Sequence, residues 1–434
     1  MFHHISRHAE TFRSFYDEIG KTAVIYPVAL LTAFGLGLTN LGVVFFARDI
    51  FHASPAAIGW LAGTWAVAYT ISCVSLRPVL ERFRPSYLII ASSFLMFAFI
   101  LAMQFVSSLP IAFVLLSLYG ISMSMFWPPL MAWLSDGHEG ASLGHRFSRY
   151  NIMWSFGNTI GPFACGWLAE RSARYPLFLG CGVFILVSVF VLGAAMVLPK
   201  ATGSTSSSDL EKTDNTEEKK ETMLRFPAWV GLFASFFGLG AMLAVFPLAA
   251  GSNLGIEESS VGLLFLFRAL LSAITFFFIG KAVFWHFRAI PMLLGQILAA
   301  GCFALLCFCH NVVSIGVFFA LLGTFAAFSY SVSVFHGVSG SVNRAKRMAI
   351  HESTLAFGII SGSAASGMLY EISSMAHVYM LCAAVILTGA IVQTTLCLRI
   401  VTTQVDGKRN YETRERRENG LFVIPSEVEG SQGP

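Results

Sequence analysis

Charge is what this sequence has least of. Only 12% of the 434 residues are Asp, Glu, Lys or Arg, whereas 56% are hydrophobic. A water-soluble protein carries about 25% charged residues, so a surface of this composition cannot face water over most of its area. The net charge of +4 gives no basis for nucleic-acid binding. We therefore expect lipid to be the main solvent of the chain.

The sequence also lacks the residue clusters from which active sites and metal centres are built. It contains no phosphate-binding loop, no catalytic triad and no set of metal ligands at the required spacing. Most of the eight cysteines lie inside apolar runs, where a thiol packs as a small hydrophobe. Cys307 and Cys309 form a CxC pair, not the CxxC of zinc and redox sites. We expect no catalytic residue, no metal and no cofactor, and we do not expect an enzyme.

What the sequence has in excess is long apolar runs. A helix needs about 20 apolar residues to cross the hydrocarbon core of a bilayer. Twelve runs approach or exceed that length, at residues 22–47, 56–76, 87–107, 109–134, 148–169, 175–198, 225–250, 258–283, 289–309, 312–336, 348–370 and 376–399. The first run is too long for a cleavable signal peptide, so we expect it to remain as a membrane helix. The predicted fold class is an all-α integral membrane protein with twelve transmembrane helices.

Polar segments divide these runs into two groups of six. Lys200–Glu221 has no apolar period and is rich in Ser, Thr, Glu and Lys, which indicates a solvated linker. The tail is polar and charged, and we expect it to be disordered. The predicted organisation is an N-terminal segment at 1–21, a six-helix bundle at 22–198, a linker at 199–224, a second six-helix bundle at 225–400 and a tail at 401–434.

The positions of the basic residues predict the orientation in the membrane. Lysine and arginine are enriched in the cytoplasmic loops of membrane proteins. With the N-terminus inside, the outer segments hold only Arg48, Arg171 and Arg174, and nearly all other basic residues fall in inner segments. We predict a multi-pass protein of the plasma membrane, the inner membrane in a bacterium, with both termini and the linker in the cytoplasm.

Two stretches, one in each half, are nearly alike. Residues 150–170 are YNIMWSFGNTIGPFACGWLAE, and residues 351–371 are HESTLAFGIISGSAASGMLYE. The shared positions are Phe156, Gly157, Gly161, Ala164, Gly166, Leu168 and Glu170, which recur as Phe357, Gly358, Gly362, Ala365, Gly367, Leu369 and Glu371. Because each unit has an even number of helices, both enter the membrane from the same side. The sequence therefore predicts two parallel halves related by an axis normal to the membrane.

Two parallel units of six helices joined by a long linker resemble the major facilitator superfamily, over residues 22–400. Members often carry G-x-x-x-D-R-x-G-R-R in the loop after helix 2. This chain has R-P-V-L-E-R-F-R at 77–84, where Glu81-Arg82 stands in place of Asp-Arg and both glycines are absent. The resemblance implies that Glu81 and Arg82 belong to an inner gate held by charge pairs. Ordinary loop charges are the alternative.

The fifth predicted helix resembles the G-x-x-x-G-P-x-x-G-G motif of the family's drug and proton antiporters, through Gly157, Gly161, Pro162 and Gly166. Cys165 replaces one glycine of the final pair. Small residues let a neighbouring helix approach closely, and proline bends a helix. The resemblance favours export, and plain small-residue packing is the alternative.

Arg268 is the clearest candidate for substrate binding, because ionisable residues inside membrane helices are rare and often functional. It lies about ten residues into the eighth predicted helix, near the membrane midplane at a rise of about 1.5 Å per residue. Its counterpart in the first half, 203 residues earlier in the chain, is Trp65. We hypothesise that both face a central cavity, where Arg268 binds an anionic or carbonyl group and Trp65 forms an aromatic wall. The alternative is that Arg268 pairs structurally or reaches toward the interface.

Glu352 is the only acid that we place within a predicted span, and it lies beside His351 at the start of the eleventh helix. A carboxylate in such surroundings can bind and release a proton, and histidine titrates near neutral pH. We regard both residues as candidates for proton coupling. The alternative is that Glu352 lies among lipid headgroups near the basic residues at 344–347.

The remaining candidates for substrate binding are polar or aromatic residues at membrane depth, namely Asn40, Tyr69, Trp127, Trp154, Asn158 and Tyr330. By the family resemblance, helices 1, 4, 7 and 10 line the cavity, which favours Asn40, Trp127 and Tyr330. An aromatic cavity with few charges suits an amphipathic organic solute better than a sugar. Simple packing is the alternative for each residue.

Taken with the resemblance, these features predict a secondary active transporter that moves a small organic, amphipathic solute by alternating access, with proton-coupled export favoured. A transporter-like membrane receptor without transport is the alternative. The expected partners are the solute, protons and the lipid bilayer, and the expected state is a monomer.

Overall fold

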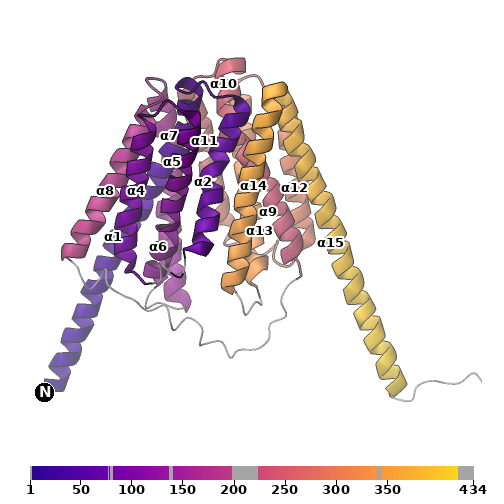
Figure 1. Cartoon of the computed structure of the whole chain (residues 1–434). Helices are drawn as coiled ribbons and strands as arrows, with labels where there is room; N and C mark the ends of the chain where they lie inside the picture. Colours follow the sequence, from indigo (N-terminus) through magenta and orange to yellow (C-terminus); the bar gives the residue numbers. More distant parts are fainter. Residues whose placement is uncertain are drawn as a thin grey trace, which may run out of the picture.

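The computed structural model describes residues 2–76, 78, 82–135, 140–197, 223–339 and 344–418, and within these ranges every regular element is a helix (Figure 1). The first half contains α1 (Phe2–Asp49), α2 (Pro55–Ser75), α4 (Pro85–Met103), α5 (Leu109–Ser124), α6 (Trp127–Ser135), α7 (Gly140–Ala169) and α8 (Tyr175–Val197). The second contains α9 (Arg225–Ala244), α10 (Phe246–Leu254), α11 (Glu258–Ile279), α12 (Ala289–Leu306), α13 (Val312–Val338), α14 (Arg344–Ile372) and α15 (Met375–Glu418). The all-α fold class is confirmed.

Eleven helical segments of the described chain are long and apolar enough to cross a membrane. They correspond to all the predicted spans except the fifth, at 148–169, which falls in α7. Asn151, Asn158 and Thr159 lower the hydropathy of α7. This helix nevertheless packs along both α1 and α11, so it belongs to the same bundle of helices. The chain is a multi-pass membrane protein.

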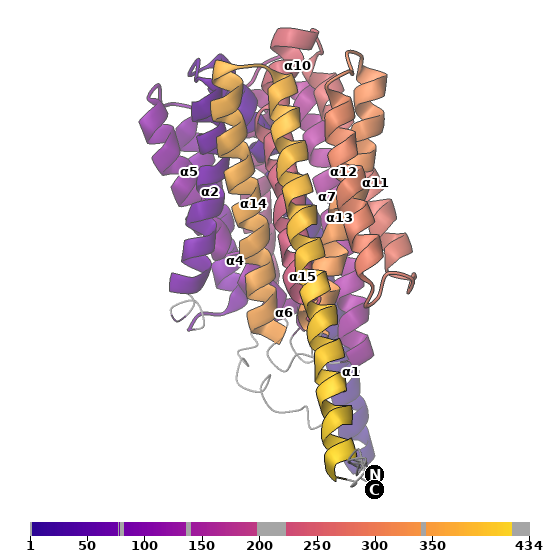
Figure 2. The same cartoon turned by 90° about the vertical axis from the view of Figure 1, so that its right-hand side faces the viewer.

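The two halves repeat one packing arrangement. In the first half, α1 packs on α7, α2 on α5 and α4 on α8. In the second half, α9 packs on α14, α11 on α13 and α12 on α15. Each pair of the second half is the repeat counterpart of a pair in the first. The start of α1 and the end of α15 lie at one end of the molecule, which we call the terminal end, and α10 lies at the other, the α10 end (Figures 1 and 2).

Glycines of α7 and α14 allow close packing within each half. A Cβ atom on Gly161 would lie 2.6 Å from the carbonyl oxygen of Phe34 in α1. A Cβ atom on Gly362 would collide with the carbonyl oxygen of Phe237 in α9, the counterpart of Phe34. Gly157 contacts α1 in the same way, one turn earlier. Because any side chain would force these helices apart, the glycines set the spacing between them.

Pro162 lies inside α7 without ending the helix. A Cβ atom on Gly37 of α1 would lie 2.7 Å from the Cδ atom of Pro162, so the proline ring packs directly on α1. The predicted motif therefore serves two interfaces: Gly157, Gly161 and Pro162 face α1 of the same half, and Gly166 faces the other half.

The two halves meet through glycines near the α10 end. A Cβ atom on Gly166 of α7 would lie 2.9 Å from the Cα atom of Gly262 in α11. A Cβ atom on Gly367 of α14 would lie 3.1 Å from the Cα atom of Gly59 in α2. These two contacts are repeat counterparts. They involve the first turns of α2 and α11, so the backbones of the two halves touch where those helices begin.

The helix boundaries differ from the predictions at several places. The predicted run 109–134 is divided into α5 and α6 before Pro128-Pro129, and the predicted run 225–250 is divided before Pro247 into α9 and α10, because proline cannot donate a helical hydrogen bond. Helix α1 begins at Phe2, so the predicted segment 1–21 is not separate from the first span. The predicted disordered tail is helical as far as Glu418, where opposite charges at four-residue spacing favour a helix. Residues 199–222 of the predicted linker and 419–434 of the tail lie outside the described residues.

Candidate substrate and coupling site

Arg268 lies in the middle of α11 without an acidic partner among the described residues. Its Nε atom is buried and makes no hydrogen bond. Its guanidinium carbon lies 6.0 Å from the centroid of the Phe265 ring, on the same helix. An ionisable side chain inside a membrane span with a buried, unbonded polar atom is a candidate binding group.

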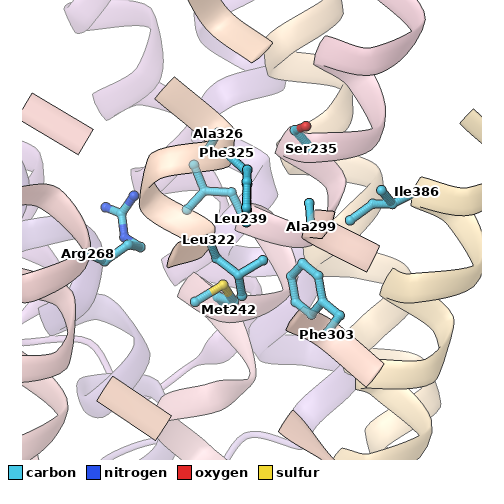
Figure 3. A pocket seen from close by; sticks show the side chains of 10 residues that line it. All are labelled: Ser235, Leu239, Met242, Arg268, Ala299, Phe303, Leu322, Phe325, Ala326 and Ile386. Carbon is cyan, nitrogen blue, oxygen red and sulfur yellow. The ribbon is translucent and has the colours of Figure 1, made fainter. Parts of the chain in front are cut away.

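The side chain of Arg268 borders a pocket inside the second half (Figure 3). The other lining residues come from α9, α12, α13 and α15, and they are Ser235, Leu239, Met242, Ala299, Phe303, Leu322, Phe325, Ala326 and Ile386. In Figure 3, Arg268 stands at one side of the pocket, opposite Phe303 and Ile386. The pocket thus combines one positive charge and one serine with an otherwise apolar wall.

Trp65 occupies the corresponding position in the first half. A Cβ atom on Gly120 of α5 would collide with the carbonyl oxygen of Trp65, and a Cβ atom on Gly323 of α13 would collide with that of Arg268. Gly120 and Gly323 are themselves repeat counterparts. The indole of Trp65 is partly buried against the core of its own half. That both side chains face one cavity stays a prediction.

His351 is fully buried at the start of the predicted eleventh span in α14. Its Nδ1 atom lies 2.8 Å from the hydroxyl of Ser333 in α13 and hydrogen-bonds it. The ring of Tyr330 meets the imidazole edge-on, with centroids 4.7 Å apart. The sequence did not single out Ser333, although its position one turn from Tyr330 on α13 was a usable signal. These contacts fix the orientation of the imidazole.

Glu352 lies near residues of both halves. Its Oε1 atom is 4.0 Å from Nε2 of His351, and its side chain is 59% exposed. It lies within electrostatic reach of Tyr69 and Tyr150 from the first half and of Tyr330 from the second. The structure therefore brings together three of the predicted residues, Glu352, Tyr69 and Tyr330.

Aromatic side chains of the first half form the other side of this region. Trp65, Tyr69, Trp127 and Trp154 all pack, partly buried, against one hydrophobic core. Trp127 meets Tyr150 edge-on at 6.4 Å between centroids, and Tyr150 is itself within reach of Glu352. The predicted aromatic residues of the first half therefore share one core, and Trp127 is linked to Glu352 through Tyr150.

The remaining predicted residues are not linked to this region by a described contact. Asn40 on α1 and Asn158 on α7 are partly buried. Arg82 is exposed in the turn before α4, and Glu81 lies outside the described residues. The predicted inner gate therefore stays a prediction. Among the described residues, no group of three or more His, Cys, Asp or Glu side chains is placed to hold a metal ion.

Two similar helical halves that pack against each other define the class of protein, a multi-pass membrane protein built on a duplicated helical unit. The family model described as Major Facilitator Superfamily matches residues 25–340 and 228–424. The chain belongs to the major facilitator superfamily, as the resemblance implied.

Two relatives are multidrug resistance proteins of Bacillus subtilis (strain 168). Multidrug resistance protein 1 is 21% identical over 255 residues, which cover 58% of this chain and 64% of that protein. Multidrug resistance protein 2 is 22% identical over 265 residues, which cover 59% and 66%. The alignments thus span less than two thirds of either relative. Among solved structures, the nucleoside transporter NupG has a TM-score of 0.69 at 12% identity over 87% of this chain and 98% of that one, which shows the shared fold.

Proposed function

We propose that the protein is a secondary active transporter that exports amphipathic organic solutes in exchange for protons. The observation that carries the proposal is the position of Glu352, a 59% exposed carboxylate beside the buried His351 and within electrostatic reach of tyrosines from both halves. Rocking of two halves around a site between them exposes that site to one side of the membrane at a time. A carboxylate at such a site would then meet the protons of each side in turn.

The proposed substrate has an apolar body and an anionic or carbonyl group. Arg268, which has no acidic partner among the described residues, supplies a positive charge at the edge of an apolar pocket. Guanidinium groups bind carboxylates and other oxygen groups through paired hydrogen bonds. The aromatic residues Trp65 and Trp127 would contact the apolar body. The names of the two multidrug resistance relatives support export of such compounds.

The structure corresponds, in this proposal, to the form that is closed at the outer face. The glycine contacts between the halves lie near the α10 end. With the termini in the cytoplasm, as the basic residues predict, the α10 end faces outward and Glu352, near the start of the span Ile350–Ile372, lies toward the cytoplasm. Solute would enter while Glu352 releases its proton, and the outward form would exchange solute for a new proton.

Reconstitution in liposomes tests the function directly. We would measure release of an anionic amphipathic dye, carboxyfluorescein, and a cationic one, ethidium, with and without a pH gradient. We expect the gradient to drive transport of the anionic dye against its concentration gradient. Gradient-dependent flux of ethidium alone would contradict the assignment of Arg268. Absence of flux for every solute in a broader library would favour the receptor alternative.

A further inference from the structure

Both repeated stretches end in the same short pattern, Gly-x-x-x-Glu. It is GWLAE at 166–170, at the end of α7, and GMLYE at 367–371, at the end of α14. Residues four apart on a helix lie on the same face. Each glutamate therefore points toward the helix that its glycine touches, one turn nearer the α10 end.

Each glutamate caps a helix of the opposite half. The backbone N–H of Ser259, in the first turn of α11, donates to Oε1 of Glu170 at 3.1 Å. The backbone N–H of Ala56, in the first turn of α2, donates to Oε2 of Glu371 at 2.9 Å. N–H groups of a first turn have no partner within their own helix, and a negative charge there interacts favourably with the helix dipole.

These two hydrogen bonds are repeat counterparts, as are the glycine contacts beneath them. Glu170 corresponds to Glu371, and Ala56 corresponds to Ser259. Each half thus contributes one carboxylate and one helix start. Both bonds cross between the halves, so neither can persist if the halves move apart at the α10 end.

A third polar contact between the halves, an ion pair, has no counterpart in the repeat. Arg48 at the end of α1 forms an ion pair with Glu258 of α11, with Nη2 and Oε1 2.7 Å apart. The residue that corresponds to Arg48 in the second half is Gly251, which cannot form an ion pair. The carboxylate caps are therefore the symmetric element of this interface.

We propose that Glu170 and Glu371 are paired gate residues that hold the α10 end shut, each by capping the first turn of a helix of the other half. The proposal rests on the alternating-access function above, in which this end must open once per cycle. In the open form the two hydrogen bonds between the carboxylates and the helix starts of the opposite half are broken. Because each cap can form only when the glycine pair beneath it is in contact, the two caps form and break together.

Hydrogen exchange followed by mass spectrometry tests the proposal on the full-length protein in lipid nanodiscs. The variants are Glu170→Ala and Glu371→Ala, and the control is Glu257→Ala, because Glu257 is the exposed N-cap residue of α11 and its side chain makes no hydrogen bond or ion pair with a described residue of the other half. The peptides to follow cover the first turns of α2 and α11. No transported solute is needed, so the outcome does not depend on whether the proposed substrate is right.

The gate role predicts a crosswise effect. Glu371→Ala removes the cap of α2, and yet exchange should rise on the order of two- to fivefold in the first turns of both α2 and α11. Glu170→Ala should do the same, whereas Glu257→Ala, which removes a charge beside the start of α11 alone, should leave exchange in α2 unchanged. Glu371→Gln, which keeps an acceptor oxygen, should restore part of the protection. A rise confined to the helix whose own cap was removed would overturn the proposal, since it would show two independent caps, and so would unchanged exchange in both helices.

Discussion

Trp65 and Arg268 occupy equivalent places in the two halves, because the backbone carbonyl of each lies against a glycine of the neighbouring helix, Gly120 or Gly323. The main-chain packing is therefore conserved between the halves while the side chains differ in charge. An amphipathic solute is itself asymmetric, with an apolar part and a polar one. A charged side chain at one position and an aromatic side chain at the equivalent position suit a solute with one polar and one apolar part.

Arg268→Ala should raise the KM for an anionic amphipathic solute about tenfold or more, since a hydrogen bond to a charged group contributes about 1.5–3 kcal/mol. Arg268→Lys should recover only part of the affinity, because lysine lacks the planar pair of donors. The measurement is initial flux against solute concentration in proteoliposomes. Arg171→Ala is the control, because Arg171 stacks on Trp167 at the α10 end, 4.0 Å from its ring centroid. Wild-type KM values for both Arg268 variants would refute the assignment.

Gly323→Ala should destabilise the protein and displace Arg268, because the added Cβ atom collides with the Arg268 carbonyl oxygen. Overpacking of this kind costs about 1–3 kcal/mol, which a thermal unfolding assay in detergent can detect. Gly301→Ala on α12 is the matched control, since a Cβ atom there meets no atom within 4 Å. We expect that control to be neutral or slightly stabilised, because alanine favours a helix more than glycine does. Equal stability of the two variants would be inconsistent with the close contact.

Glu352→Gln should uncouple transport from the pH gradient. The amide is similar in size and cannot exchange a proton, so downhill flux should continue while a pH gradient no longer drives accumulation. The readout is the ratio of flux with and without an imposed gradient, and Glu257→Gln serves as the control at the α10 end. If Glu352→Gln kept the wild-type ratio, Glu352 would have no coupling role.

Ser333→Ala should lower the thermal stability, because it removes the partner of the buried His351 Nδ1 atom, which lies 2.8 Å from the serine hydroxyl. Leaving a buried polar group unpaired costs about 1–3 kcal/mol. Ser331→Ala is the matched control, because the Ser331 hydroxyl bonds only to the Ala327 carbonyl of its own helix among the described residues. A similar loss of thermal stability in both variants would show that the hydrogen bond to His351 contributes no more than the intrahelical bond of Ser331.

Much of the fold was predictable from local patterns. The apolar runs predicted the spans, because only a helix satisfies its backbone groups within lipid. The glycine repeat predicted the register, and the contacts of Gly161 with Phe34 and of Gly362 with Phe237 agree with it. The break before Pro247 was missed, although proline at that position was a visible signal. The helical part of the tail up to Glu418 was also missed, because charged composition alone does not distinguish a solvated helix from a disordered segment.

The candidate site was predictable in its members and not in its arrangement. Arg268 and Glu352 stand out because charges inside spans are rare. The hydrogen bond between Ser333 and His351 and the position of Tyr69 near Glu352 depend on how α2, α13 and α14 pack, which no local pattern specifies. The bonds of Glu170 and Glu371 to helix starts of the opposite half were overlooked although both residues belong to the repeat, because these bonds join residues 89 and 315 positions apart.

The sequence by itself determined the all-helical class, the apolar spans and the duplication, because hydrophobic length and small-residue spacing are local properties of the chain. The tertiary structure alone decided which faces meet. It placed Gly166 against Gly262 and Gly367 against Gly59, and so brought each glutamate to a helix start of the other half. Contacts between the halves depend on their relative position, which is encoded by no single segment.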